Sequence, residues 1–215
     1  MTPPELHLPV VFNVGAVFFF ALTGALAARR LGYDIVGVFM LAFVTGVGGG
    51  LIRDALLRGA GPVAALTDQR IISAVLVATI CGVFRIATRL EIFNRMVALL
   101  DAIGLGAFAV VGTDMALHAD LHWMAAIFVG VTNAVGGGLL RDLMTRSEPL
   151  MLKPGQFYAL AALFGAGVYV WMIRGRHMAV VPAAIIATGA TVMLRSLTIA
   201  FNWKTRAVDG SLSGA

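Results

Sequence analysis

Seven apolar runs, each long enough to cross a lipid bilayer as a helix, fill most of this chain. A spanning helix needs about 20 mostly apolar residues, and inside a bilayer only helices and closed barrels satisfy their own backbone hydrogen bonds. Short polar turns separate the runs, which we expect at residues 9–28, 35–57, 70–89, 97–117, 122–144, 155–173 and 178–201. The pattern predicts an all-α membrane protein with seven transmembrane helices.

Composition excludes a soluble protein. Only 13% of the 215 residues are charged and 60% are hydrophobic, with a mean hydropathy of +0.92, whereas soluble domains carry about 25% charged residues. The net charge of +5 suits basic loops beside membrane spans and anionic lipid, and we expect no nucleic-acid partner. The N-terminus lacks a positive region, so no cleaved signal peptide is expected.

The most distinctive motif of the sequence occurs twice, 88 residues apart. VGGGLIRD at 47–54 aligns with VGGGLLRD at 135–142, and seven of the eight positions are identical. The same shift pairs Gly24 with Gly112, Asn13 with Asp101 and Thr45 with Asn133. We therefore expect one transmembrane domain over 1–206, built from a repeat at about 9–89, a second at about 97–173 and an extra helix at about 178–201. Residues 207–215 form a polar tail.

Three helices per repeat fix the relation between the repeats. An odd number of crossings places the second repeat upside down, related to the first by a pseudo-two-fold axis in the membrane plane. With the N-terminus outside, nine loop Lys and Arg residues fall on the inner side and four on the outer side. The inner nine are Arg29, Arg30, Arg85, Arg89, Arg95, Arg146, Lys153, Lys204 and Arg206, and the outer four are Arg58, Arg70, Arg174 and Arg176. This bias predicts a plasma (inner) membrane protein with its N-terminus outside and its C-terminus in the cytoplasm.

The glycine triplets allow two interpretations. Small residues let helices pack closely, or the helix uncoils there and its freed carbonyls line a hydrated path. The duplication and the neighbouring charges favour the second interpretation. The glycines concerned are Gly48, Gly49, Gly50, Gly136, Gly137 and Gly138. Together with oxygens of Thr23, Thr45, Thr132 and Asn133, such carbonyls suit partly hydrated monovalent cations. We expect transient K⁺ or Na⁺ rather than a fixed metal, and no cofactor.

An Arg-Asp pair follows each triplet: Arg53-Asp54 and Arg141-Asp142. Snorkelling to the interface is one interpretation, and a role in the path is the other. Adjacent helical residues point about 100° apart, so we expect neither Arg to pair with the Asp that follows it. The topology instead places Asp101 at the depth of Arg141 on the inner side and Asn13 at the depth of Arg53 on the outer side. We expect these two pairs to form two pseudo-equivalent gates.

Two inverted three-helix repeats, a seventh helix and a GGGLxRD box in the second helix of each repeat resemble the prokaryotic branch of the trimeric intracellular cation (TRIC) channel family. The resemblance covers about residues 9–201. It implies a homotrimer with one pore in each subunit, bent at the glycines, and K⁺-permeable conduction. The matching positions are the six glycines and the two Arg-Asp pairs.

The sequence is also compatible with other functions. Inverted repeats and broken helices are also typical of secondary transporters, for example of a small amino acid, and a lipid-organising protein without transport is a third reading. An enzyme ranks last because no catalytic set is brought together. Arg195 is expected to snorkel inward, or else to contact the fourth helix or a lipid headgroup. His118 and His122 belong to a polar loop, with a divalent-ion or proton sensor at the outer mouth as the alternative.

Overall fold

The structure is a computed structural model that describes residues 8, 10–57, 67–84, 90–152, 157–201 and 203. Its helices are α1 (Val10–Arg30), α2 (Ile35–Leu56), α4 (Gln69–Val83), α5 (Leu90–His118), α6 (Trp123–Met144), α7 (Tyr158–Val170) continued by the π-turn η1 (Trp171–Gly175), and α8 (Val180–Ala200). Among these residues six helical segments are long and apolar enough to cross a membrane, and α4 is a shorter apolar helix. The expected all-α, seven-helix class is confirmed.

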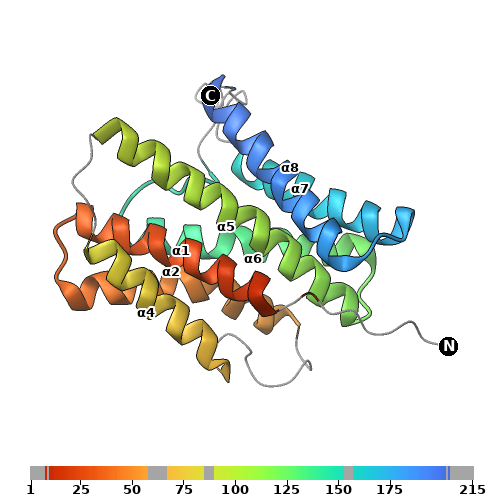
Figure 1. The fold of residues 1–215 in the computed structure, drawn as a ribbon, viewed down its shortest axis with the longest axis horizontal. Helices are drawn as coiled ribbons and strands as arrows, with labels where there is room; N and C mark the ends of the chain where they lie inside the picture. The colour runs from red at the N-terminus through yellow and green to blue at the C-terminus, as the bar shows by residue number, and fades with distance from the viewer. Residues whose placement is uncertain are drawn as a thin grey trace, which may run out of the picture.

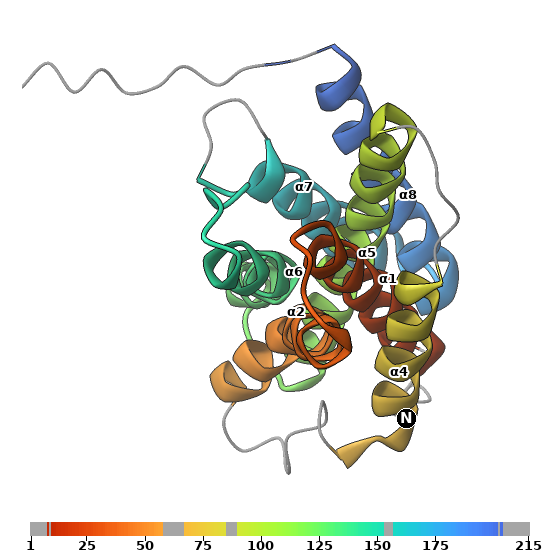
Figure 2. The ribbon, with the colours of Figure 1, turned by 90° about the vertical axis from the view of Figure 1, so that its left-hand side faces the viewer.

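The helices form one bundle in which successive long helices run in opposite directions (Figure 1). In this view α1 runs from right to left, and α8 finishes at the top of the bundle. Viewed along the bundle, α1 and α5 lie near the middle, with α2, α6, α7, α8 and α4 around them (Figure 2). Rings of Phe20 and Phe108 meet between α1 and α5, with centroids 5.2 Å apart, in the core.

The duplication in the sequence is also a duplication of helix boundaries. Helices α2 and α6 begin and end 88 residues apart, and α1 and α5 end at positions with the same separation. Two boundaries differ most from expectation: α4 ends at Val83 rather than at 89, and α5 begins at Leu90 rather than at 97, so α5 is the longest helix. Positions 85–89 of the expected third span, and the predicted polar tail, lie outside the described residues.

Polar side chains fix the helix ends at one side of the bundle. The Asp34 carboxylate accepts a hydrogen bond of 2.8 Å from Gly37 N–H and caps α2. Arg29, in the last turn of α1, donates to the carbonyls of Gly82 and Val83 at the end of α4, where a positive charge is favourable. Both contacts hold the connections of the first repeat.

The outer surface of the bundle is apolar, as a lipid-facing surface must be. Ile35, Phe128 and Met193 are 69%, 66% and 65% exposed, which would be costly in water. Helix α8 packs on α5 and α7 and therefore covers the second repeat. The first repeat has no such extra helix within the described part of the chain.

Candidate functional site

Helices α2 and α6 cross where their glycine triplets meet. A Cβ atom added to Gly49 would lie 2.2 Å from the Asn133 carbonyl oxygen, and one added to Gly137 would lie 2.2 Å from that of Thr45. These two contacts are related by the 88-residue shift, so the pseudo-two-fold axis passes through the crossing. Only glycine allows two backbones to approach so closely.

The triplets do not uncoil, which corrects the sequence prediction. Both helices are continuous through them and all six glycines are buried. Gly48 faces the Leu140 side chain and Gly136 faces that of Ile52. The prediction went wrong because each triplet has the other as its packing partner, so no carbonyl needs to leave the helical hydrogen-bond ladder. Close packing is the reading that this conformation supports.

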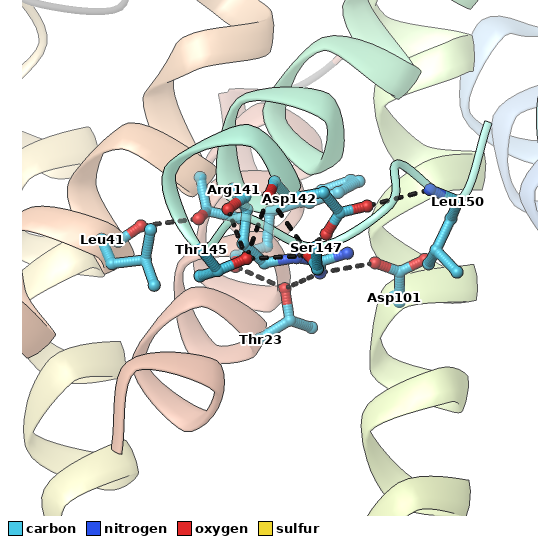
Figure 3. Close-up of polar contacts among 10 residues, drawn as sticks. Thr23, Leu41, Asp101, Arg141, Asp142, Thr145, Ser147 and Leu150 are labelled. Carbon is cyan, nitrogen blue, oxygen red and sulfur yellow. Dashed lines mark hydrogen bonds and ion pairs between the residues drawn. The ribbon is translucent and has the colours of Figure 1, made fainter. Parts of the chain in front are cut away.

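Arg141 lies at the centre of a buried polar cluster near the end of α6 (Figure 3). Its Nη1 donates to Asp101 Oδ1 of α5 at 3.0 Å and to Thr23 Oγ1 of α1 at 3.1 Å. Arg141, Asp101 and Thr23 are each at most 6% exposed. The predicted contact between Arg141 and Asp101 is therefore present, and it ties α6 to α5 while Thr23 adds α1. Its role as a gate remains a prediction.

The neighbouring carboxylates do bind their arginines, contrary to expectation. Arg141 Nε donates to Asp142 Oδ1 at 2.9 Å, and Arg53 Nε donates to Asp54 Oδ1 at 2.8 Å. An arginine side chain is long enough for its Nε to turn back to the next residue, even though the two Cβ atoms diverge. Asp142 also accepts the backbone N–H of Leu150 through Oδ2 at 3.0 Å. It thereby fastens the segment that follows α6.

The first repeat carries a weaker version of this cluster. Arg53 is fully buried and Asp54 is mostly so. No hydrogen bond or ion pair joins Arg53 to Asn13 in the described ranges, and Asn13 is half-buried. The predicted outer contact is thus not formed. The side-chain amide of Asn13 carries no net charge and so attracts a guanidinium only weakly across the helix interface. The negatively charged carboxylate of Asp101 attracts it strongly.

Polar side chains lie buried between the two arginines. The Thr45 hydroxyl donates to the Leu41 carbonyl at 2.6 Å, and Asn133 Nδ2 donates to the Phe108 carbonyl at 2.7 Å. Asn133 Oδ1 is buried without a hydrogen-bond partner among the described residues. Thr132 is less buried and donates to the Phe128 carbonyl at 2.9 Å. Thr23, Thr45 and Asn133 are therefore the interior oxygens, and Thr132 is peripheral.

The Arg141 cluster has two further neighbours: Tyr158, which the sequence did not predict, and Arg195, which was expected to snorkel inward or to contact the fourth helix or a lipid headgroup. Tyr158, at the start of α7, is 2% exposed, and its hydroxyl would lie 3.0 Å from a Cβ on Gly138. The guanidinium carbon of Arg195 lies 5.1 Å from the centre of the Tyr158 ring. Arg195 is 4% exposed, so it does not snorkel as expected. The sequence marked Arg195 as unusual because it is a lone charge inside the last apolar run. No feature of the sequence distinguished Tyr158 from the other aromatic residues.

The histidines at the opposite side form no metal site. Within the described part of the chain no group of three or more His, Cys, Asp or Glu side chains could hold an ion. His118 Nδ1 lies 2.8 Å from the Asp114 carbonyl oxygen, and His122 caps α6 by accepting from Met124 N–H at 3.4 Å. Both side chains thus have local structural contacts at helix ends.

The duplicated architecture is also found in known proteins. A family model described as "Glycine transporter" matches this chain twice, over residues 10–86 and 98–174, which are the two repeats. A TRIC trimeric intracellular cation channel orthologue from Rhodobacter sphaeroides is 33% identical and has a TM-score of 0.80 over 89% of this chain and 97% of its own. The chain belongs to the prokaryotic branch of the TRIC channel family. A second solved prokaryotic TRIC channel, in 0.5 M KCl, has a TM-score of 0.81 at 27% identity over 90% of this chain and 96% of its own.

Relatives of this TRIC family member are bacterial membrane proteins. The UPF0126 inner membrane protein YadS of Escherichia coli K12 is 31% identical over 185 residues, which are 86% of this chain and 88% of YadS. A UPF0126 membrane protein of Deinococcus radiodurans is 39% identical over 158 residues, or 73% and 72% of the two chains. The TRIC family member described here is accordingly a multi-pass membrane protein, and its solved relatives are ion channels rather than enzymes.

Proposed function

We propose that this protein is a channel for monovalent cations, K⁺ among them, with a path inside each subunit between the two repeats. The observation that carries the proposal is the buried polar column on a fold shared with solved cation channels. Arg53 and Arg141 mark its two ends, and Thr45 and Asn133 lie between them. Buried polar groups in a membrane interior are costly and mark ion or substrate pathways.

The chemistry of the column favours monovalent cations. Hydroxyl, amide and carbonyl oxygens are hard ligands that can replace part of a hydration shell. A buried guanidinium at each end repels divalent cations more strongly than monovalent ones. Asp101 and Asp142 compensate that charge at one end and Asp54 at the other, so a K⁺ ion would meet a nearly neutral path.

We regard the conformation described here as closed. The glycine crossing brings α2 and α6 into backbone contact in the middle of the column, and the Arg141–Asp101 ion pair bridges α6 and α5 at one end. Opening requires the two helices to move apart at the glycine surfaces, where Leu140 and Ile52 pack on the opposite triplets, and the ion pair to separate. Gating at the triplets then depends on sliding rather than on uncoiling.

Assembly and orientation follow the family and the charge bias. We propose a homotrimer surrounded by membrane lipids, as the solved R. sphaeroides orthologue is a trimeric channel. We also propose the N-terminus outside and the C-terminus in the cytoplasm, because basic loop residues are in excess on the inner side in that orientation. The Arg141 cluster then faces the cytoplasm.

Planar-bilayer recording of the purified protein under a KCl gradient tests the proposal. We expect unitary current steps that reverse near the K⁺ equilibrium potential and disappear when a large organic cation replaces K⁺. Arg141→Ala should change the open probability, whereas Arg146→Ala, which removes an exposed charge from the same side, should not. Absence of steps from folded protein would contradict the proposal.

A secondary transporter is the second candidate, favoured by the description of the matching family model and by the inverted repeats. It predicts saturable counterflow of a small solute, such as glycine, into proteoliposomes without unitary current steps. The two outcomes are distinguished by recording currents and solute flux from the same preparation.

A further inference from the structure

Helix α8 brings a charge into the Arg141 cluster from outside the duplication. It packs on α5 and α7 and has no counterpart in the first repeat within the described ranges. Helix α8 is otherwise apolar or uncharged, and its one charged residue, Arg195, is buried, with 4% of its surface exposed. Burying a guanidinium is costly unless other groups compensate it, so the contacts of Arg195 must explain its position.

Those contacts lead directly to the proposed gate. The guanidinium carbon of Arg195 lies 5.1 Å from the centre of the Tyr158 ring, within the range of a cation–π interaction. Tyr158 is itself buried, and its hydroxyl lies against Gly138, the last glycine of the α6 triplet. Tyr158 of α7 therefore lies between Arg195 of α8 and the glycine surface of α6.

The carboxylate of Asp101 couples the same arginine to the ion pair. Asp101 accepts the 3.0 Å hydrogen bond from Arg141, and we infer that its negative charge also attracts the buried guanidinium of Arg195. The cluster then holds two guanidinium groups, Arg141 and Arg195, against two carboxylates, Asp101 and Asp142. Without Arg195 it would carry an excess negative charge, and Asp101 would be less firmly held.

We propose that Arg195 is a positioning residue of the gate, through which α8 holds Tyr158 against Gly138 and Asp101 beside Arg141. This inference rests on the proposed channel function and adds a control element to it. The first repeat cannot be controlled in this way: the position equivalent to Tyr158 is Arg70, which is exposed. Among the described residues, α8 is therefore connected to the end that holds the Arg141 cluster and makes no contact with α2, which carries Arg53.

Single-channel recording of Arg195→Gln tests the proposal. Loss of a desolvated cation–π contact and of one positive charge should raise the open probability about tenfold, with the unitary conductance unchanged because Arg195 reaches the gate from outside the path. Arg195→Lys keeps the charge and should restore most of the wild-type open probability. A merely structural role would not separate open probability from conductance.

Arg176→Gln is the matched control. It removes the same charge and a similar contact, 5.7 Å from the centre of the Trp171 ring, but at an exposed site directly after η1, beyond the other end of α7. It should leave the open probability at the wild-type value. Equal effects of the two Gln variants, or no effect of Arg195→Gln, would overturn the proposal.

A second measurement separates this inference from the channel proposal. In detergent, the fall in Tm of the Arg195→Gln, Asp101→Asn double variant should be smaller than the sum of the two single falls, because both remove one interaction. Arg195→Met, which also removes the positive charge, takes the place of Arg195→Gln if the latter does not fold. Additive shifts would refute the coupling, whereas a wild-type protein that does not conduct would refute only the channel function.

Discussion

The two ends of the buried column carry the same sequence motif but are closed in different ways. At the α6 end, Arg141 binds Asp101 of α5, Thr23 of α1 and its neighbour Asp142. At the α2 end, Arg53 is equally buried but binds its own neighbour Asp54, with no bond to Asn13 among the described residues. One end is therefore tied across three helices, whereas the hydrogen bond of Arg53 to Asp54 at the other end stays within α2.

The comparison indicates where duplication was kept and where it was lost. The glycine crossing has kept its pseudo-symmetry, because each triplet is the packing surface of the other and a change in one would break both. The ends do not contact each other, so Asn13 and Asp101 were free to diverge. We expect equivalent substitutions to have equal effects at the crossing and unequal effects at the ends.

The largest effect should come from the crossing. Gly49→Ala and Gly137→Ala each place a methyl group 2.2 Å from a backbone carbonyl oxygen that cannot move without its helix. Each should lower the free energy of unfolding by at least about 3 kcal/mol, and the two losses should agree within about 1 kcal/mol. Thermal unfolding in detergent measures both.

Gly189→Ala provides the control for these glycine variants. Its Cβ would meet nothing within 4 Å, and the residue lies in helix α8. The substitution should be neutral or stabilise the protein by up to about 1 kcal/mol. Clearly unequal losses for Gly49→Ala and Gly137→Ala would mean that the crossing is not pseudo-symmetric.

An intermediate effect is expected for Asp101→Asn, which gives the second repeat the residue of the first. Arg141 would lose its partner on α5 while staying buried, which costs about 3 kcal/mol in typical proteins. The matched change Asn13→Ala should cost below about 1 kcal/mol, because no bond to Arg53 is lost. Chemical denaturation of both variants would detect the difference, and equal costs would remove the asymmetry between the ends.

The smallest expected effect is the difference in stability loss between Asp142→Asn and Asp54→Asn, the carboxylates that follow the two arginines. Asp142→Asn weakens both the Arg141 contact and the anchor to Leu150 N–H, whereas Asp54→Asn affects the Arg53 contact. The first should be more destabilising by about 1 kcal/mol, the typical net value of one hydrogen bond. Hydrogen exchange at the Leu150 amide should accelerate in Asp142→Asn and stay unchanged in Asp54→Asn.

Much of the fold followed from sequence because membrane helices obey strong one-dimensional rules. Length and apolarity predicted the seven helices, and the repeated box predicted the 88-residue register that α2 and α6 follow at both ends. The Arg141–Asp101 contact could also be predicted, since topology brought one carboxylate to the depth of that arginine.

The remaining features depend on contacts between helices, which a sequence does not state. A glycine triplet considered in one helix alone predicts a break in that helix. Its contact with the triplet of the other helix shows that it is a packing surface. Tyr158 and Arg195 lie on α7 and α8, outside the motif, and they join the cluster only because α8 folds back over the second repeat. The turn of each arginine back to its neighbour is a rotamer choice fixed by burial.

The open probability of Asp101→Asn in a planar bilayer tests the central claim most directly. We expect the wild-type channel in symmetrical KCl to be mostly closed, and Asp101→Asn to open about tenfold more often at the same unitary conductance, since the buried cross-helix ion pair is lost. An open probability equal to that of the wild type would contradict the claim that this ion pair closes the path.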